Sequence, residues 1–182
     1  NYPVGSHEGG YGPFEFKIND LLNIGKTNFL SVRVLGPIVN QDKVIDGLGK
    51  NDAPHWRGAI AGGIWQSVRL KSCGNVSIED VFIKPNILNN SIEVELELFN
   101  HNVKHLEENV SFKIYNTDNK IVLQNSDSLL LQPGKNISKH SFIIPNAQRW
   151  SPSNPNLYNF SVEVNNKDAE IIRFGLRELT IK

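Results

Sequence analysis

Alternating apolar and polar residues dominate the second half of this chain. In residues 92–98, I-E-V-E-L-E-L, apolar side chains occupy every second position and three glutamates lie between them. A period of two places the apolar set on one face of a strand and the glutamates on the other. Residues 110–115 and 158–164 follow the same pattern. Each segment is therefore expected to form a half-buried antiparallel strand.

Turn sequences separate these strands. They are Thr117-Asp118-Asn119, Pro133-Gly134 and Asn165-Asn166, and such residues favour turns. From Val76 to Lys182 the pattern predicts six or seven short strands. Strands of this length, divided by turns at this spacing, are typical of an immunoglobulin-like sandwich.

The first part of the chain differs in composition, because most of the fourteen glycines of the whole chain fall before residue 64. We expect strands at 14–18, 29–35 and 64–71, and one helical turn around 18–22, capped by Asn19 or Asp20. Three strands with long glycine-rich loops do not close a core, because their edges would stay bare. The pattern breaks at 72–75, which predicts a domain boundary there.

Composition narrows the classes of function. Nineteen basic residues balance nineteen acidic ones, so no net field attracts nucleic acid, and we expect no nucleic-acid partner. No apolar run approaches the ~20 residues that span a bilayer, so we expect no membrane span. Cys73 is the only cysteine, and methionine is absent. A single cysteine argues against a multi-cysteine zinc site. The absence of methionine leads us to expect an excised piece of a longer protein.

Several motifs resemble those of one known family. GSHEGGYGPFEF (5–16), SVRV (31–34) and GGIWQSVRL (62–70) lie in the first part, and RWSP (149–152), PNLY (155–158) and FGLR (174–177) close the second. Together they resemble the front end of a family 2 glycoside hydrolase.

The resemblance implies an all-β fold of two domains. A partial jelly-roll sugar-binding domain of the galactose-binding type would occupy 1–73, and an immunoglobulin-like β-sandwich would occupy 74–182. In this family both domains precede a catalytic barrel, which would begin beyond Lys182. The implied partners are carbohydrate in the parent enzyme, its own barrel and a possible second copy in a homo-oligomer. A periplasmic or secreted location is favoured over a cytoplasmic one.

The carboxylates give no catalytic pair. A retaining glycosidase needs two carboxyl groups ~5 Å apart. Glu107 and Glu108 are adjacent, so on a strand they point to opposite faces, and Glu93, Glu95 and Glu97 lie on a solvent face. We therefore expect no catalytic residue in this chain, and no metal or cofactor.

The loop at 47–63 holds the best candidates for binding. It is long and glycine-rich, and it brings Asp52, His55, Trp56 and Arg57 close together in sequence. Long ordered loops tend to be functional. Trp56 can stack on a pyranose ring, and Asp52 and Arg57 can hydrogen-bond its hydroxyls. In the family this loop approaches the active site of the barrel, so the four residues are predicted to bind substrate, with packing against the barrel as the alternative.

Three hypotheses of function stay open. The first is a set of non-catalytic accessory domains of a retaining exo-β-glycosidase, acting on a β-linked galactoside, glucuronide or mannoside, with a β-galactosidase as the first choice. The second is a free-standing carbohydrate-binding or adhesion module. The third is a purely structural pair of sandwiches.

Overall fold

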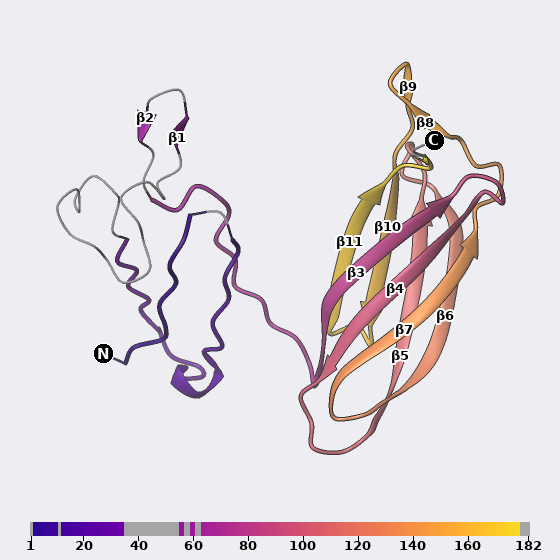
Figure 1. Cartoon of the computed structure of the whole chain (residues 1–182). Coiled ribbons are helices and arrows are strands. Elements are labelled where there is room, and N and C mark those ends of the chain that lie inside the picture. The colour runs from indigo at the N-terminus through magenta and orange to yellow at the C-terminus, as the bar shows by residue number, and fades with distance from the viewer. Residues whose placement is uncertain (1, 11, 35–54, 57–58, 61–62, 179–182) are drawn as a thin grey trace. The chain divides into compact units, whose positions relative to one another are not determined.

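The chain divides into two compact units, residues 1–69 and 70–182 (Figure 1). A computed structural model describes residues 2–10, 12–34, 55–56, 59–60 and 63–178. The predicted domain limits of 1–73 and 74–182 are not tested by this division and stay a prediction.

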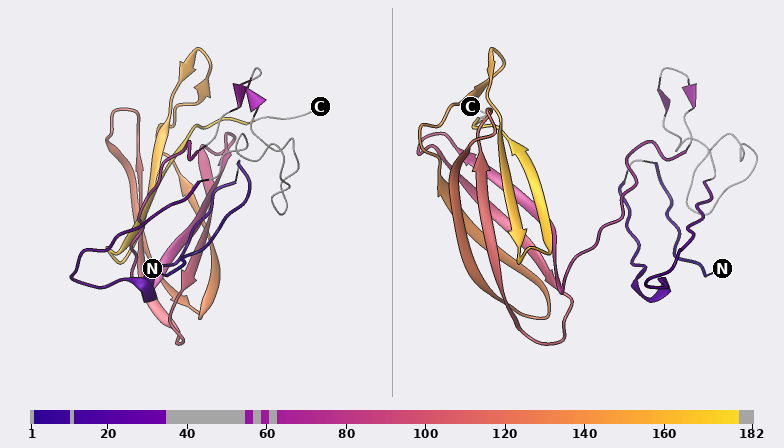
Figure 2. Two further views of the ribbon diagram at one scale, coloured as in Figure 1. Left: turned by 90° about the vertical axis from the view of Figure 1, so that its left-hand side faces the viewer. Right: turned by 180° about the vertical axis from the view of Figure 1, so that it is seen from behind.

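The second unit is a β-sandwich of seven main strands in two antiparallel sheets (Figures 1 and 2). One sheet has the order β3-β4-β7 and the other β11-β10-β5-β6. A two-stranded hairpin, β8-β9, adds a small third sheet. The bounds are β3 (Val76–Asn86), β4 (Ser91–Asn100), β5 (Leu106–Tyr115), β6 (Ile121–Leu131), β7 (Gly134–Ile143), β8 (Trp150–Ser151), β9 (Asn154–Pro155), β10 (Tyr158–Val164) and β11 (Asp168–Phe174). The predicted all-β fold is confirmed.

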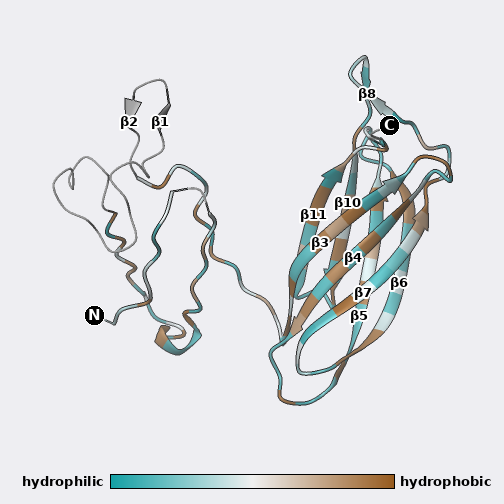
Figure 3. Ribbon diagram, in the orientation of Figure 1, coloured by the Kyte–Doolittle hydropathy of each residue, from teal (hydrophilic) through white to brown (hydrophobic). Residues whose placement is uncertain are grey.

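The core lies between the two sheets and follows from the alternation in the sequence. Figure 3 shows hydrophobic and hydrophilic residues alternating along the strands. The inward set is fully buried at its centre, where the rings of Phe112, Phe142 and Phe160 lie within 5.2–6.0 Å of one another. Such a cluster buries a large apolar area. The strands predicted at 92–98, 110–115 and 158–164 are confirmed as parts of β4, β5 and β10.

Asparagine and glycine make the turns, as the sequence indicates. Asn165 and Asn166 both have positive φ, 47° and 56°, between β10 and β11. Two consecutive residues in the left-handed region form a type I′ turn, whose twist matches that of a hairpin. Gly134 also has positive φ, 85°, at the start of β7. The predicted turns at these positions are confirmed.

The C-terminal corner of the sandwich explains the motifs there. The backbone N–H of Trp150 donates to the backbone carbonyl of Leu176, 3.0 Å away. A Cβ on Gly175 would lie 3.0–3.2 Å from Trp150 side-chain atoms, so only glycine lets this indole approach. The Arg177 guanidinium lies over the same ring, 5.1 Å from its centroid, in a cation–π contact. Trp150, Gly175 and Arg177 therefore form one packing unit.

The first unit contains little regular structure in its described residues. It has one 3-10 turn, η1 (Asn19–Leu21), and two short paired strands, β1 (His55–Trp56) and β2 (Ala59–Ile60). The predicted turn is confirmed, but the predicted cap is wrong, because Ile18 is the N-cap and no side chain of the described residues caps it.

The prediction of three strands in the first part of the chain is wrong. The described residues of 14–18, 29–35 and 64–71 are assigned no strand. Their apolar side chains are largely exposed, Phe29 at 94% and Trp65 at 66%. An extended segment becomes a strand only when a neighbour accepts its backbone hydrogen bonds, and the described part of this unit supplies none. Among the described residues, no helix is long and apolar enough to cross a membrane.

Candidate functional site

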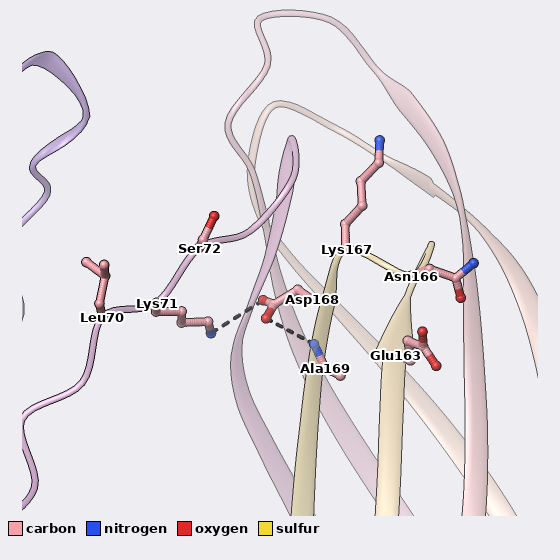
Figure 4. Close-up of a pocket in the computed structure, with 8 residues that line it drawn as sticks. All are labelled: Leu70, Lys71, Ser72, Glu163, Asn166, Lys167, Asp168 and Ala169. Atoms are coloured by element: carbon pink, nitrogen blue, oxygen red, sulfur yellow. Dashed lines mark hydrogen bonds and ion pairs between the residues drawn. The ribbon is translucent and has the colours of Figure 1, made fainter. Parts of the chain in front are cut away.

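A polar pocket of about 380 Å³ lies where the chain enters the sandwich (Figure 4). The segment before β3 passes the turn between β10 and β11 there. The pocket is lined by Leu70, Lys71, Ser72, Glu163, Asn166, Lys167, Asp168 and Ala169. Charged and amide groups dominate this lining, so the pocket suits polar contacts rather than an apolar ligand.

Asp168 is the centre of the pocket's hydrogen bonding. It is the first residue of β11, directly after the type I′ turn, and its side chain is only 6% exposed. One carboxylate oxygen, Oδ2, accepts the Ile78 N–H at 2.7 Å and lies 3.4 Å from the Lys71 Nζ. The other, Oδ1, accepts the Ala169 N–H at 3.0 Å. Both oxygens are thus occupied by donors from the chain itself.

Lys71 completes this arrangement. Its Nζ donates to the Ile78 carbonyl at 2.7 Å. Ile78 lies in β3, an edge strand, next to a register shift between Ile78 and Asp80. Edge strands leave backbone groups without a strand partner. Asp168 and Lys71 satisfy the N–H and the C=O of Ile78, and so join β3 of one sheet to β11 of the other.

The carboxylates around Lys71 control its charge. Burial lowers the pKa of Lys71, but Asp168 raises it, helped by Glu170 and Glu79, so the net pKa lies above the usual value. For the Cys73 thiol, burial acts in the opposite direction and raises the pKa, and the Asp168 carboxylate raises it further. Lys71 is therefore protonated and positively charged at neutral pH, and Cys73 is a thiol rather than a reactive thiolate.

Close packing also fastens the entering chain. A Cβ on Gly74 would lie 2.6 Å from Cδ and 3.1 Å from Cβ of Lys167. The backbone at Gly74 thus passes directly beneath the stem of a side chain on the β10–β11 turn. Together with the Lys71–Asp168 pair, this contact indicates an anchor for the segment before β3 rather than a centre for acid–base chemistry.

The residues predicted to bind sugar are not tested. Asp52 and Arg57 lie outside the described residues, as do the side chains of His55 and Trp56. The backbones of His55 and Trp56 pair with Ile60 and Ala59 in the short hairpin of β1 and β2. Their role in substrate binding stays a prediction.

The predictions on the carboxylates can be compared with the structure. Glu108 is buried, and its Oε2 has no hydrogen-bond partner among the residues that the structure describes, whereas Glu107 is exposed and accepts from the Ser128 hydroxyl at 2.8 Å. The two side chains therefore point to opposite faces, as predicted. Glu95 and Glu97 face solvent and pair with Lys139 and Lys135, at 3.4 and 2.7 Å.

Sequence reasoning did not find Lys71 and Asp168. A signal existed for Asp168, because it follows Asn165-Asn166 and interrupts the apolar pattern at an inward position, opposite Val164. No pattern in the sequence indicates its partner Lys71, 97 positions earlier in the numbering.

Known proteins resemble this chain in sequence and in fold. The family model of glycosyl hydrolases family 2 matches residues 76–177. A β-galactosidase of Thermoanaerobacterium thermosulfurigenes is 30% identical over 193 aligned positions, which cover 98% of this chain and 25% of that protein. A β-galactosidase of Clostridium acetobutylicum is 28% identical over 192 positions, covering 98% and 19%. The chain thus spans a quarter or less of these curated relatives.

Solved structures share the fold. A glycosyl hydrolase family 2 member from Bacteroides cellulosilyticus aligns with a TM-score of 0.55 and 20% identity, covering 59% of this chain and 15% of that one. A β-glucuronidase of glycoside hydrolase family 2 aligns with a TM-score of 0.54 and 16% identity, covering 58% and 13%. At these identities the similarity shows the fold alone.

Proposed function

Because the chain belongs to glycosyl hydrolases family 2, we propose that it forms accessory domains of a retaining exo-β-glycosidase. The proposed parent acts on a β-linked galactoside, with glucuronides and mannosides as the other candidates. The observation that carries this proposal is the alignment of nearly the whole chain with relatives named β-galactosidase. In this proposal the catalytic barrel lies elsewhere in the parent protein, and the present chain packs against it.

The engagement of the carboxylates supports a non-catalytic role. Glu107 and Glu108 point to opposite faces, and the oxygens of Asp168 are taken by backbone N–H groups and Lys71. Retaining chemistry needs two free carboxyl groups facing one cleft, ~5 Å apart. Glu107 and Glu108 cannot form such a pair because they point to opposite faces, and both oxygens of Asp168 already accept from donors of the chain.

The test compares the isolated chain with the full-length product of its gene. Both are assayed with 4-nitrophenyl β-galactoside, β-glucuronide and β-mannoside. We expect the full-length protein to hydrolyse the galactoside and the isolated chain to hydrolyse none of the three. Hydrolysis by the isolated chain would overturn the accessory role, and a full-length protein without glycosidase activity would overturn the proposed parent.

We further propose that Asp52, His55, Trp56 and Arg57 border the sugar subsite of that parent. In the full-length protein, Trp56→Ala should then raise KM for the galactoside with a smaller effect on kcat, since stacking on a sugar ring contributes ground-state binding. Trp65→Phe is the matched control, because Trp65 Nε1 donates to the Gly10 carbonyl at 2.9 Å and serves structure. An unchanged KM in Trp56→Ala would refute the subsite.

A calorimetric titration of the isolated chain with galactose tests the alternative of a free-standing binding module. The accessory role predicts little or no heat of binding, because the barrel supplies most contacts to the sugar. Measurable affinity, lost in Trp56→Ala, would favour the binding module instead.

A further inference from the structure

The edge strands of the two sheets meet along two seams. One seam lies between β3 and β11, and the other lies between β6 and β7 (Figures 1 and 2). The β3–β11 seam is held by Asp168, whose carboxylate accepts the Ile78 N–H and pairs with Lys71. A backbone N–H does not titrate, and the raised pKa of Lys71 keeps its charge. The contacts of this seam are therefore constant between about pH 5 and 8.

The β6–β7 seam is held by a histidine instead. The side chain of His140, in β7, is only 10% exposed, and its Nδ1 lies 3.6 Å from Oδ2 of Asp127 in β6. The other ring nitrogen, Nε2, lies 3.0 Å from the hydroxyl of Ser138 on the same strand. Histidine is the side chain whose charge ordinarily changes between about pH 5 and 8. The contact across this seam therefore contains a group that can titrate.

The ring of His140 is part of the aromatic core. Its centroid lies 4.6 Å from that of Phe112 and 6.2 Å from that of Phe142, and the second pair is nearly parallel, at 11°. Phe112 is fully buried, and Phe142 is 4% exposed. A charge in such apolar surroundings loses much of its hydration. The site therefore suits the neutral ring better than the protonated one.

The charges that face this ring compensate little. On β6 the facing carboxylate is Asp127, which is 55% exposed and is therefore screened by water. On the inward face of β5 the titratable group is Glu108, four positions before Phe112. The other inward side chains of β7, and those of β4 and β10, are uncharged. Burial thus outweighs Asp127, and the pKa of His140 lies below its usual value.

The turn between β6 and β7 fixes one end of this seam. The side-chain oxygen of Asn136 accepts the Gln132 N–H at 2.9 Å, and its NH2 group donates to the Gln132 carbonyl at 2.8 Å. An amide side chain does not titrate in this range. Among the described strands, β7 pairs with β4 alone. The strand can therefore separate from the sandwich by breaking a single ladder, with this turn as the pivot.

We propose that the β6–β7 seam is acid-sensitive, so that β7 separates from β4 more readily when His140 takes up a proton. Since Nδ1 faces the Asp127 carboxylate, the neutral ring carries its proton there, and the second proton goes to Nε2. The Ser138 hydroxyl can then no longer donate to Nε2. The charged ring is better hydrated after separation, so acid favours the open arrangement. This proposal is independent of the proposed enzymatic role, because it rests on the sandwich alone.

Native-state amide exchange of the whole chain, at about pH 7.5 and about pH 5, tests the proposal once the intrinsic effect of pH on exchange is corrected. Amides of the β4–β7 ladder should lose protection in acid by up to ~30-fold, the limit that a pKa of ~6.5 in the open state sets at pH ~5. Their exchange should depend weakly on urea, because a local opening exposes little surface. Amides between β5 and β10, in the middle of the other sheet, should show the steeper dependence of global unfolding.

Three variants locate the effect. His140→Gln should abolish the loss of protection in acid. Asp127→Asn should increase the loss, because the charge that partly offsets burial is gone. His105→Gln is the matched control, since His105 is an exposed histidine in the connection between β4 and β5. It should behave like the wild type.

Several results would overturn the proposal. One is equal protection of the β4–β7 ladder at both pH values. Another is a loss that the β5–β10 amides share with the same urea dependence, since this would be global unfolding. A loss that persists in His140→Gln would assign the effect to another group. A smaller loss in Asp127→Asn would mean that the protonated ring tightens the seam, and this test remains if His140→Gln fails to fold.

Discussion

Asp168→Asn tests whether the pocket at the start of the sandwich is a structural anchor. The substitution keeps the size of the side chain but replaces one acceptor oxygen by an NH2 group. Because Oδ1 and Oδ2 accept from Ala169 and Ile78, the amide must turn its NH2 toward one of these N–H donors. It also removes the charge that pairs with Lys71.

The size of the effect follows from the burial of these groups. Ile78 is 2% exposed and the Asp168 side chain 6% exposed, so water cannot replace the lost acceptor. A hydrogen bond to a charged group contributes ~1.5–3 kcal/mol, and an unsatisfied buried donor costs ~1–3 kcal/mol. Since these contributions overlap, we expect Asp168→Asn to lower the free energy of unfolding by ~2–4 kcal/mol.

The assay is urea unfolding of the chain at pH 7, followed by far-ultraviolet circular dichroism. With a slope of ~2 kcal/mol per molar, the midpoint should fall by ~1–2 M. Glu170→Gln is the control, because Glu170 Oε1 lies 3.6 Å from the same Lys71 Nζ but its side chain is 42% exposed. Its effect should stay below ~0.5 kcal/mol. Asp168→Asn within ~0.5 kcal/mol of wild type would refute the anchor.

Three further predictions concern packing and pH. Phe112→Ala should lower the free energy of unfolding by ~3–5 kcal/mol, measured in urea, because the ring is fully buried; a loss below ~1 kcal/mol would contradict this core. Gly175→Ala should cost ~1–3 kcal/mol by crowding Trp150, and an unchanged melting temperature would contradict that packing. Burial lowers the pKa of His140, and the Asp127 carboxylate offsets only part of this. The folded state therefore prefers the neutral ring, so its stabilising contribution is complete above pH ~6.5 and is lost as the pH falls through the lower folded pKa. His140→Gln should flatten this part of the pH profile, and an unchanged slope would contradict it.

The sequence predicts the sandwich well because local pattern and burial agree there. From Ile92 onward β4 alternates between the core and a polar face, on which Glu95 and Glu97 pair with lysines. Asn165 and Asn166 are suited to positive φ, so the β10–β11 turn could be placed to the residue. In these segments the local sequence alone is enough to predict which residues form the strand and which form the turn.

The sequence fails where a partner decides the outcome. A strand is expected at 64–71, yet without a neighbour the described segment stays unpaired, with Trp65 and Val68 exposed. The Lys71–Asp168 anchor joins residues far apart in the chain. Neither has a local signature, because both depend on which segments become neighbours in space.

The motifs that indicate the family at the C-terminal end are themselves packing motifs. Trp150 needs Gly175 because a Cβ there would crowd the indole, and Arg177 covers the same ring. The Tyr158 hydroxyl accepts the Gln148 N–H at 2.8 Å, which ties the start of β10 to the segment before this corner. These residues identify the family through the shape of one corner and supply no group for cleaving a glycosidic bond. Recognition of the family and location of the chemistry are thus separate questions for this chain, and the second is answered by activity measured on the full-length protein.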